Sequence, residues 1–126
     1  MTSLRQWALI DIETTGVDPN YDQIIDLGFL QFDGTKLVKK YSSLVRTEVR
    51  LSKFIEKLTG ISQEMVNNAP LWSKVEQDLL DLDGHALIAH NAQFEEMFLK
   101  KYFDRIDEGQ TREQYCDSMY FLSLLF

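Results

Sequence analysis

The stretch Trp7-Ala-Leu-Ile-Asp-Ile-Glu-Thr-Thr-Gly16 joins an apolar run to two acids and a turn. Residues 7–12 are almost all apolar and predict a strand. Gly16 and the Asp18-Pro19-Asn20 run predict the turn that ends it. Asp11 and Glu13 are two positions apart, so their side chains share one face of that strand. The fold is therefore expected to start with a strand that carries converging carboxylates at its end.

Two carboxylates held together are unfavourable unless a cation or a proton compensates their charge. Oxygen-rich sites of this kind suit Mg²⁺ or Mn²⁺. The next residues, Thr14, Thr15 and Gly16, offer two hydroxyls and a flexible turn that a phosphate or a sugar could approach. The spacing of Asp11 and Glu13 alone fits a strand that ends in solvent-facing acids equally well, and at this point both interpretations stay open.

Length and composition bound the class of protein. A chain of 126 residues with 44% hydrophobic and 26% charged residues is typical of one globular domain, expected to span 1–126. Cys116 is the one cysteine, which excludes an internal disulfide and fits a reduced, cytoplasmic location. No apolar run reaches the roughly 18 residues that predict a transmembrane helix.

The net charge of −7 argues against a protein that coats nucleic acid by general electrostatic attraction. It does not exclude an enzyme whose carboxylates hold cations. Seven cations nevertheless cluster between positions 36 and 57, where only Glu48 and Glu56 oppose them. This strip is either a solvated face or a phosphate-contacting surface. It comprises Lys36, Lys39, Lys40, Arg46, Arg50, Lys53 and Lys57.

The remaining chain predicts an α/β protein. Residues 23–32 and 36–45 read as strands joined at Asp33-Gly34, a strong hairpin signal. Helices are expected over about 53–58, between Ser52 and Gly60, and over 71–80. A strand at 85–90 and a helix capped by Asn91 follow, then a loop at 104–113, a short strand at 115–116 and a last helix begun by Asp117 or Ser118. This order predicts a mixed sheet, with a three-stranded antiparallel meander, flanked by helices.

Several motifs together resemble one enzyme family. The string Asp11-Ile12-Glu13-Thr14-Thr15-Gly16, directly after an apolar strand, resembles the first motif of DEDD-type (DEDDh) 3′→5′ exonucleases. The subgroup that fits contains the proofreading (epsilon) subunit of bacterial DNA polymerase III. The resemblance continues, in the same order, through Asp22–Gly28, Leu58–Ser62, the second-motif segment Ala89-His-Asn-Ala-Gln-Phe-Glu95, and Tyr115–Ser118.

The resemblance implies an RNase H-like (exonuclease) fold and two-metal hydrolysis, with Mg²⁺ or Mn²⁺, of phosphodiester bonds at a single-stranded 3′ end of DNA. It implies that Asp11 bridges both metals, that Glu13 helps hold the ion that activates water, and that Glu95 acts near them. The 3′-terminal nucleotide, released as a nucleoside monophosphate, would meet Thr14, Thr15, Gly16, the Leu58–Ile61 segment and the second-motif residues His90, Asn91 and Phe94.

Two departures from the family pattern matter. The family has Asp where this chain has Glu95, which is either a ligand near the metals or a surface helix acid. The family's third motif, a histidine followed five positions later by an aspartate, is not found, because the only histidines are His85 and His90. That absence and the apolar run Met119–Phe126 predict that more chain normally follows. We therefore expect this chain to be nearly inactive alone and to belong to a longer nuclease attached to a polymerase or helicase module.

Two other functions stay open on the sequence. One is a catalytically inactive nucleic-acid-binding module that keeps the fold but not the chemistry. The other is an RNA-trimming exoribonuclease of the same superfamily. The oligoribonuclease branch usually has methionine where this chain has Thr14, which favours DNA. Replication and repair are the processes that such a DNA exonuclease would serve.

Overall fold

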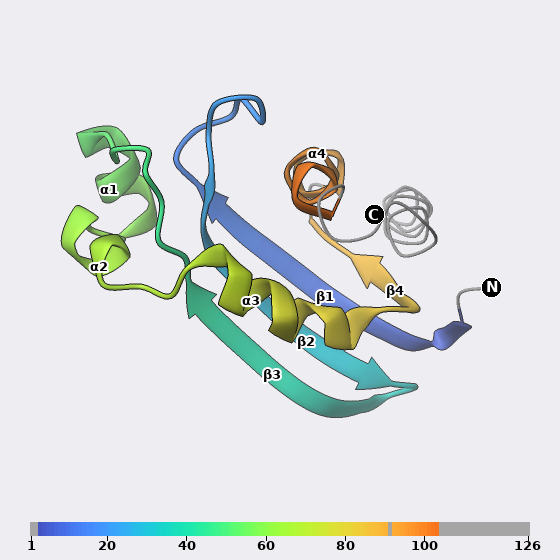
Figure 1. Ribbon diagram of the computed structural model, residues 1–126. Helices are drawn as coiled ribbons and strands as arrows, with labels where there is room; N and C mark the ends of the chain where they lie inside the picture. The colour runs from blue at the N-terminus through green and yellow to red at the C-terminus, as the bar shows by residue number, and fades with distance from the viewer. Residues whose placement is uncertain (1–2, 91, 104–126) are drawn as a thin grey trace.

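The computed structural model describes residues 3–90 and 92–103, which are built around a four-stranded sheet (Figure 1). The strands are β1 (Ser3–Thr14), β2 (Ile24–Asp33), β3 (Lys36–Leu44) and β4 (His85–Ile88). Their order in the sheet is β3-β2-β1-β4. The first three strands are antiparallel neighbours, whereas β4 pairs parallel to β1. The predicted mixed sheet with an antiparallel meander is confirmed.

Five helical elements accompany the sheet in the described part of the chain. They are α1 (Lys53–Thr59), α2 (Gln63–Asn67), α3 (Trp72–Leu79), the 3₁₀ turn η1 (Leu80–Leu82) and α4 (Ala92–Phe103). Figure 1 shows α3 lying across the sheet, while α1 and α2 form a small group beyond the carboxyl ends of β1 and β3. None of these helices is both long and apolar enough to cross a bilayer.

Local signals explain where several elements begin and end. Gly34 has a φ of 62° in the β2–β3 turn, a conformation that glycine adopts without a Cβ clash. The Ser52 hydroxyl accepts a hydrogen bond from the Ile55 amide at 3.1 Å and so caps α1. Gly60 closes the same helix in the left-handed conformation. The predicted hairpin and both predicted limits of this helix are confirmed.

The main core lies on one face of β1. Ala8, Ile10 and Ile12 alternate along the strand and are all buried. They pack with side chains of α3, β4 and α4, among them Leu79, Leu87, Phe98 and Leu99. The helices therefore cover the even-numbered face of β1, and the odd-numbered face carries Asp11 and Glu13.

A second, smaller core fixes α1 and α2 to the start of β2. It consists of Ile25, Leu51, Ile55, Ile61 and Val66, with Leu44 packed against it. This cluster places α1 beside the end of β1, where the predicted active-site residues lie.

The structure differs from the sequence prediction at several places. Strand β4 ends at Ile88 rather than at residue 90. Helix α2 was not predicted, since its 5 residues are too few to show a helical period. Its start is fixed by Ser62, whose hydroxyl accepts a hydrogen bond from the Met65 amide at 3.1 Å. Strand β1 begins at Ser3 rather than at Trp7, because Gln6 pairs with Asp33 and Ser3 with His85. The expected loop at 104–113, strand at 115–116 and final helix lie outside the described residues.

The adjacent pair Leu79 and Leu80 tests the assignment of the core. Leu79 is fully buried, whereas Leu80 is 41% exposed. We expect Leu79→Ala to lower the free energy of unfolding by about 2–5 kcal/mol through lost burial and a residual cavity. Leu80→Ala, the matched control, should have a clearly smaller effect. Urea unfolding at an unchanged m-value measures both, and equal effects would contradict the assignment.

Candidate active site

The two acids of the first motif lie at the carboxyl end of β1, in the middle of the sheet. Asp11 faces Gly28 across the β1–β2 pair, and Glu13 faces Asp26. Asp11 is exposed and Glu13 is partly buried. Because Asp11 and Glu13 are two residues apart on an extended strand, both point to the same face.

Burial and mutual repulsion raise the pKa of two acids in this group. The pKa of Glu13 is raised mainly by burial and further by the charges of Asp11 and Asp26. The pKa of Asp26 is also raised, chiefly by burial; a backbone hydrogen bond with Leu27 lowers it in part, and the charge of Asp11 makes a smaller raising contribution. At the end of β1, negative charges therefore lie near one another, and none of the causes that shift these two pKa values is a cation.

Glu95, on α4, belongs to the same electrostatic group. It is only 3% exposed, so the alternative of a surface helix acid does not hold. Its Oε1 atom is buried without a hydrogen-bond partner. Burial, and then the charges of Asp11 and Glu13, raise the pKa of Glu95 to about 7. An unpartnered buried carboxylate oxygen is unfavourable unless it gains a proton or a cation.

The carboxylates are coupled but not assembled into a complete cation site. Among the residues that the structure describes, no group of three His, Cys, Asp or Glu side chains is close enough to hold a metal ion. The charge of Asp11 acts on both Glu13 and Glu95, and the charge of Glu13 acts on Glu95, although the three do not form such a group.

A pocket of about 190 Å³ opens beside Glu13. Its walls come from the end of β1, the following loop, α1 and α4. Val17, Phe54 and Leu58 border it and are among the most exposed large apolar side chains of the described residues, at 79%, 71% and 67%. The full lining is Ile12, Glu13, Thr14, Gly16, Val17, Phe54, Ile55, Leu58, Thr59 and Phe94. Exposed apolar side chains around a carboxylate suit a ligand with a flat apolar part and a cation-binding part.

Asp11 opens instead into a larger pocket of about 650 Å³ on the sheet. Leu9, Leu30 and Ile88 line this pocket together with His90 and Lys40. Asp11 therefore lines the larger pocket and Glu13 the smaller one.

The residues predicted to contact the nucleotide do not all lie in one pocket. Thr14, Gly16, Leu58 and Phe94 line the smaller pocket, and His90 lines the larger one. Ile61 is 6% exposed and belongs to the small core beside α1.

Thr15 does not line either pocket, since its hydroxyl donates a hydrogen bond to Asp22 at 2.8 Å inside the loop. Asn91 lies outside the described residues. Val17 was missed, because nothing in the sequence marks an exposed loop valine as a pocket residue.

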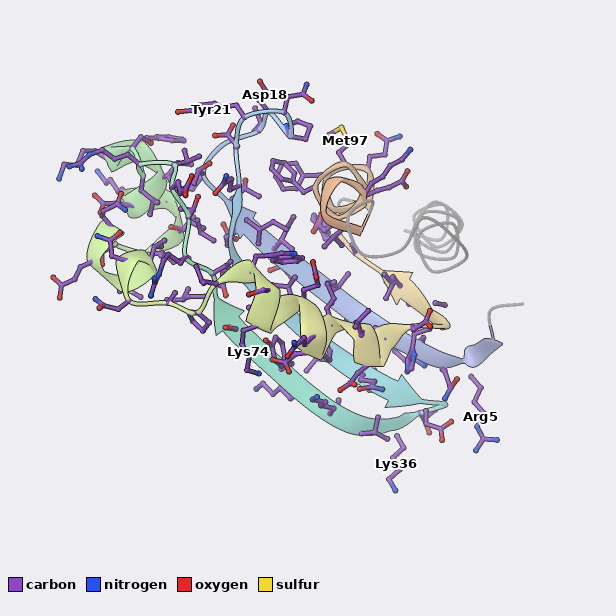
Figure 2. The ribbon with its side chains drawn as sticks, viewed as in Figure 1. Arg5, Asp18, Tyr21, Lys36, Lys74 and Met97 are labelled. Atoms are coloured by element: carbon purple, nitrogen blue, oxygen red, sulfur yellow. The ribbon has the colours of Figure 1, made fainter. Side chains whose placement is uncertain are left out.

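The predicted basic strip is not continuous. Lys39 forms a 2.8 Å ion pair with Asp81, and the Arg46 side chain donates to the Ala69 carbonyl. Lys36 lies at the end of the sheet far from the loop that follows β1 (Figure 2). Only the members on α1, Lys53 and Lys57, are close in the chain to the pocket residues Phe54 and Leu58.

A sequence profile identifies the family of this chain. The RNase_T profile, described as Exonuclease, matches residues 8–126. The chain belongs to the RNase_T exonuclease family. The predicted membership of the DEDD exonucleases is thereby confirmed. Strand β1 with its acids, the buried helix acid and the apolar pocket are thus parts of an exonuclease domain.

Two named proteins are similar to this chain over most of its length. The 3′-5′ exonuclease DinG of Staphylococcus saprophyticus is 31% identical over 121 residues, which cover 95% of this chain but 13% of DinG. The PolC-type DNA polymerase III of Thermotoga maritima is 31% identical over 114 residues, covering 90% of this chain and 8% of the polymerase. The chain thus spans under one sixth of either relative.

Solved structures confirm the RNase H-like exonuclease fold. Exonuclease I in complex with an inhibitor superposes with a TM-score of 0.69 at 13% identity, covering 82% of this chain and 25% of exonuclease I. A 3′-exonuclease that recognises the histone mRNA stem-loop superposes with a TM-score of 0.63 at 21% identity, covering 80% of this chain and 42% of that one. At these identities the likeness concerns the fold alone.

The raised pKa of Glu95 predicts a pH-dependent stability in metal-free buffer. Between its ordinary pKa of 4.5 and about 7, the unfolded chain releases the Glu95 proton while the folded chain keeps it. The free energy of unfolding should therefore fall as the pH rises through this range. Glutamine resembles protonated glutamate and does not titrate. Glu95→Gln should therefore remove the decrease in the free energy of unfolding that Glu95 causes over this pH range.

Urea unfolding at several pH values measures the slope. The neighbouring acid provides the control, since Glu96→Gln should keep the wild-type pH dependence. The same slope in Glu95→Gln and in the wild type would contradict the assignment.

Proposed function

We propose that residues 1–126 form a single exonuclease domain that removes nucleotides from a single-stranded 3′ end of DNA with the help of Mg²⁺ or Mn²⁺. The observation that carries this proposal is the position of Glu13. It belongs both to the group of mutually repelling carboxylates and to the lining of the apolar pocket. A terminal nucleotide has the matching parts, a flat base joined through its sugar to a phosphate.

The donor set fits a divalent cation. The Oε1 atom of Glu95 lacks a hydrogen-bond partner, and the acids that raise its pKa are Asp11 and Glu13. Asp11, Glu13 and Glu95 are therefore the residues that would hold the cations, since carboxylate oxygens are the ligands that Mg²⁺ and Mn²⁺ prefer. Bound divalent cations lower the pKa of water and neutralise charge on phosphoryl oxygens during hydrolysis.

The chain's other residues would bind and orient the 3′ end. Phe54 and Leu58 on α1, with Phe94 on α4, offer apolar surfaces on which a base can stack. The Thr14 hydroxyl already donates to the Gly16 carbonyl, so its oxygen is left to accept a hydrogen bond. Lys53 and Lys57 on α1 would contact the phosphates of the preceding nucleotides, which the net charge of −7 would otherwise repel.

The names of the relatives support DNA over RNA. One similar protein is named as a DNA polymerase and another as the exonuclease DinG. Since the chain matches a small part of each, we propose that it works in replication or repair, in the cytoplasm, as one module of a longer protein that includes a polymerase or helicase. An exoribonuclease activity is the competing substrate choice, because one structure with this fold recognises histone mRNA.

A second function is favoured by the incomplete cation site. Because no three ligand side chains converge in the described residues, a binding module that holds a 3′ end without cutting it fits the same pocket. The two functions differ in whether a bound strand is shortened.

Cation binding is the first prediction of the proposed function. A ligand that binds only the folded state stabilises it, by about 2.7 kcal/mol at a concentration 100 times its Kd. Mn²⁺ should therefore raise the melting temperature, and Asp11→Ala should abolish the rise. Asp33→Asn, at the other end of the sheet and paired with Arg5, should leave the rise intact. An equal rise in Asp11→Ala would contradict a site at Asp11.

Activity is the second prediction. A 5′-labelled oligodeoxynucleotide should shorten slowly, one nucleotide at a time from its 3′ end, when Mn²⁺ is present and the enzyme is in large excess, since this chain alone is expected to be nearly inactive. Asp11→Asn should slow this by about 100-fold or more, because a metal site contributes several kcal/mol to the transition state. Asp33→Asn should not slow it. Mn²⁺-dependent binding of the oligonucleotide without any shortening would support the binding module instead, and cleavage without a cation would contradict both functions.

A further inference from the structure

The loop that joins β1 to β2, residues 15–23, forms one wall of the smaller pocket. Gly16 and Val17 are the loop residues that line it, opposite Phe54 and Leu58 of α1. The loop is tied at its neck, where the Thr15 amide donates to the Gln23 carbonyl at 2.9 Å. Figure 2 shows Asp18 and Tyr21 at its tip.

The carboxylate of Asp22 fills the inside of this loop and is 9% exposed. Its Oδ1 accepts a hydrogen bond from the Thr15 hydroxyl at 2.8 Å, and its Oδ2 accepts one from the Asp18 amide at 3.0 Å. Gly16 packs directly against it, since a Cβ at position 16 would lie 2.4 Å from Oδ2. Asp22 thus touches the neck, the pocket wall and the tip of the loop at once.

The same hydrogen-bond network extends to the segment that precedes α1. The Thr15 hydroxyl oxygen accepts from the Gln23 amide at 3.0 Å. The Gln23 side-chain oxygen accepts from the Thr47 hydroxyl, whose oxygen accepts from the Val49 amide at 3.1 Å. Val49 lies four residues before the start of α1 at Lys53, so hydrogen bonds on either side of Gln23 connect Asp22 to the segment that leads to the helix carrying Phe54 and Leu58.

We propose that Asp22 is a positioning residue for the terminal nucleotide: its carboxylate holds the 15–23 loop closed and so sets the spacing between Val17 and the exposed side chains of α1. This inference rests on the proposed function, since it assumes that the smaller pocket receives a nucleotide. Asp22 itself lines neither pocket. It acts through the position of Gly16 and Val17, and the carboxylates on β1 stay where the sheet holds them.

This separation makes the role measurable. Loss of the Asp22 carboxylate should weaken nucleotide binding while leaving cation binding at Asp11 and Glu13 unchanged. If Asp22 merely stabilised the fold, its substitution would lower the melting temperature. The affinities for the nucleotide and for the cation would then both stay unchanged or both fall.

The experiment compares wild type, Asp22→Asn and Asp22→Ala by calorimetric titration with Mn²⁺ alone, and then with thymidine 5′-monophosphate at saturating Mn²⁺. We expect both variants to bind Mn²⁺ as the wild type does. Their Kd for the nucleotide should rise at least about tenfold, as loss of a hydrogen bond to a charged group implies. Asp78→Asn is the matched control, because Asp78 accepts hydrogen bonds from Tyr41 and Lys74 far from the loop. It should keep both affinities.

The contact with Gly16 provides a second test. Gly16→Ala should weaken nucleotide binding in the wild-type background, because its Cβ displaces the Asp22 carboxylate. In the Asp22→Ala background that collision is gone, so Gly16→Ala should have a smaller effect. Such coupling is expected only if the two residues act through one contact. A melting curve for each variant confirms that it is folded. If Asp22→Ala does not fold, the nucleotide and Mn²⁺ affinities of Asp22→Asn alone test the inference.

The outcomes separate the inference from the proposed function. If the wild type binds the nucleotide and Asp22→Asn binds it with the same Kd, the inference is overturned and the proposed function stands. Absence of nucleotide binding by the wild type would overturn both. A parallel loss of Mn²⁺ and nucleotide affinity in Asp22→Asn would show a structural role and would also overturn the inference.

Discussion

The alternation of side chains along β1 is the constraint on which the rest of the molecule depends. Even-numbered residues of this strand enter the core with α3 and α4, and the odd-numbered Asp11 and Glu13 face away from that core. A shift of one residue in its pairing would bury both acids and expose Ile10 and Ile12. Pairing on both sides, antiparallel to β2 and parallel to β4, holds the register. Burial of the apolar face therefore also fixes the acids in place.

Holding acids in this way has an electrostatic consequence. Glu13, Asp26 and Glu95 all have raised pKa values, and in each case burial is the main cause. Raised pKa values of buried acids destabilise the fold. Apolar burial in the small core beside α1, and the packing of Phe98 and Leu99 on α4, offset part of this destabilisation. Charge that the protein does not neutralise itself is available to a cation, and a substrate phosphate can share that cation. The same arrangement that weakens the metal-free fold would thus favour the binding of a cation.

Much of the fold follows from local sequence signals. The Asp33-Gly34 pair, the Ser52 cap and Gly60 define a hairpin and a helix through contacts within a few residues. Helix α2 escaped prediction because its 5 residues show no period and its one fully buried side chain, Val66, packs against a core built by distant segments. The early start of β1 also depends on distant partners, since Gln6 pairs with Asp33 and Ser3 with His85.

The sequence by itself determined the acidic strand, the order along the chain of the four strands with α1, α3 and α4, and the family, because these depend on neighbouring residues and on motifs in a fixed order. Only the tertiary structure decided that Glu95 is buried with an unpartnered oxygen, that Val17 joins Phe54 and Leu58 around one pocket, and that Asp22 sits inside the loop against Gly16. Burial, charge coupling and close backbone approach depend on how segments far apart in the chain meet. A sequence pattern reports the residues that can take part, and the packing of the sheet and helices selects those that do.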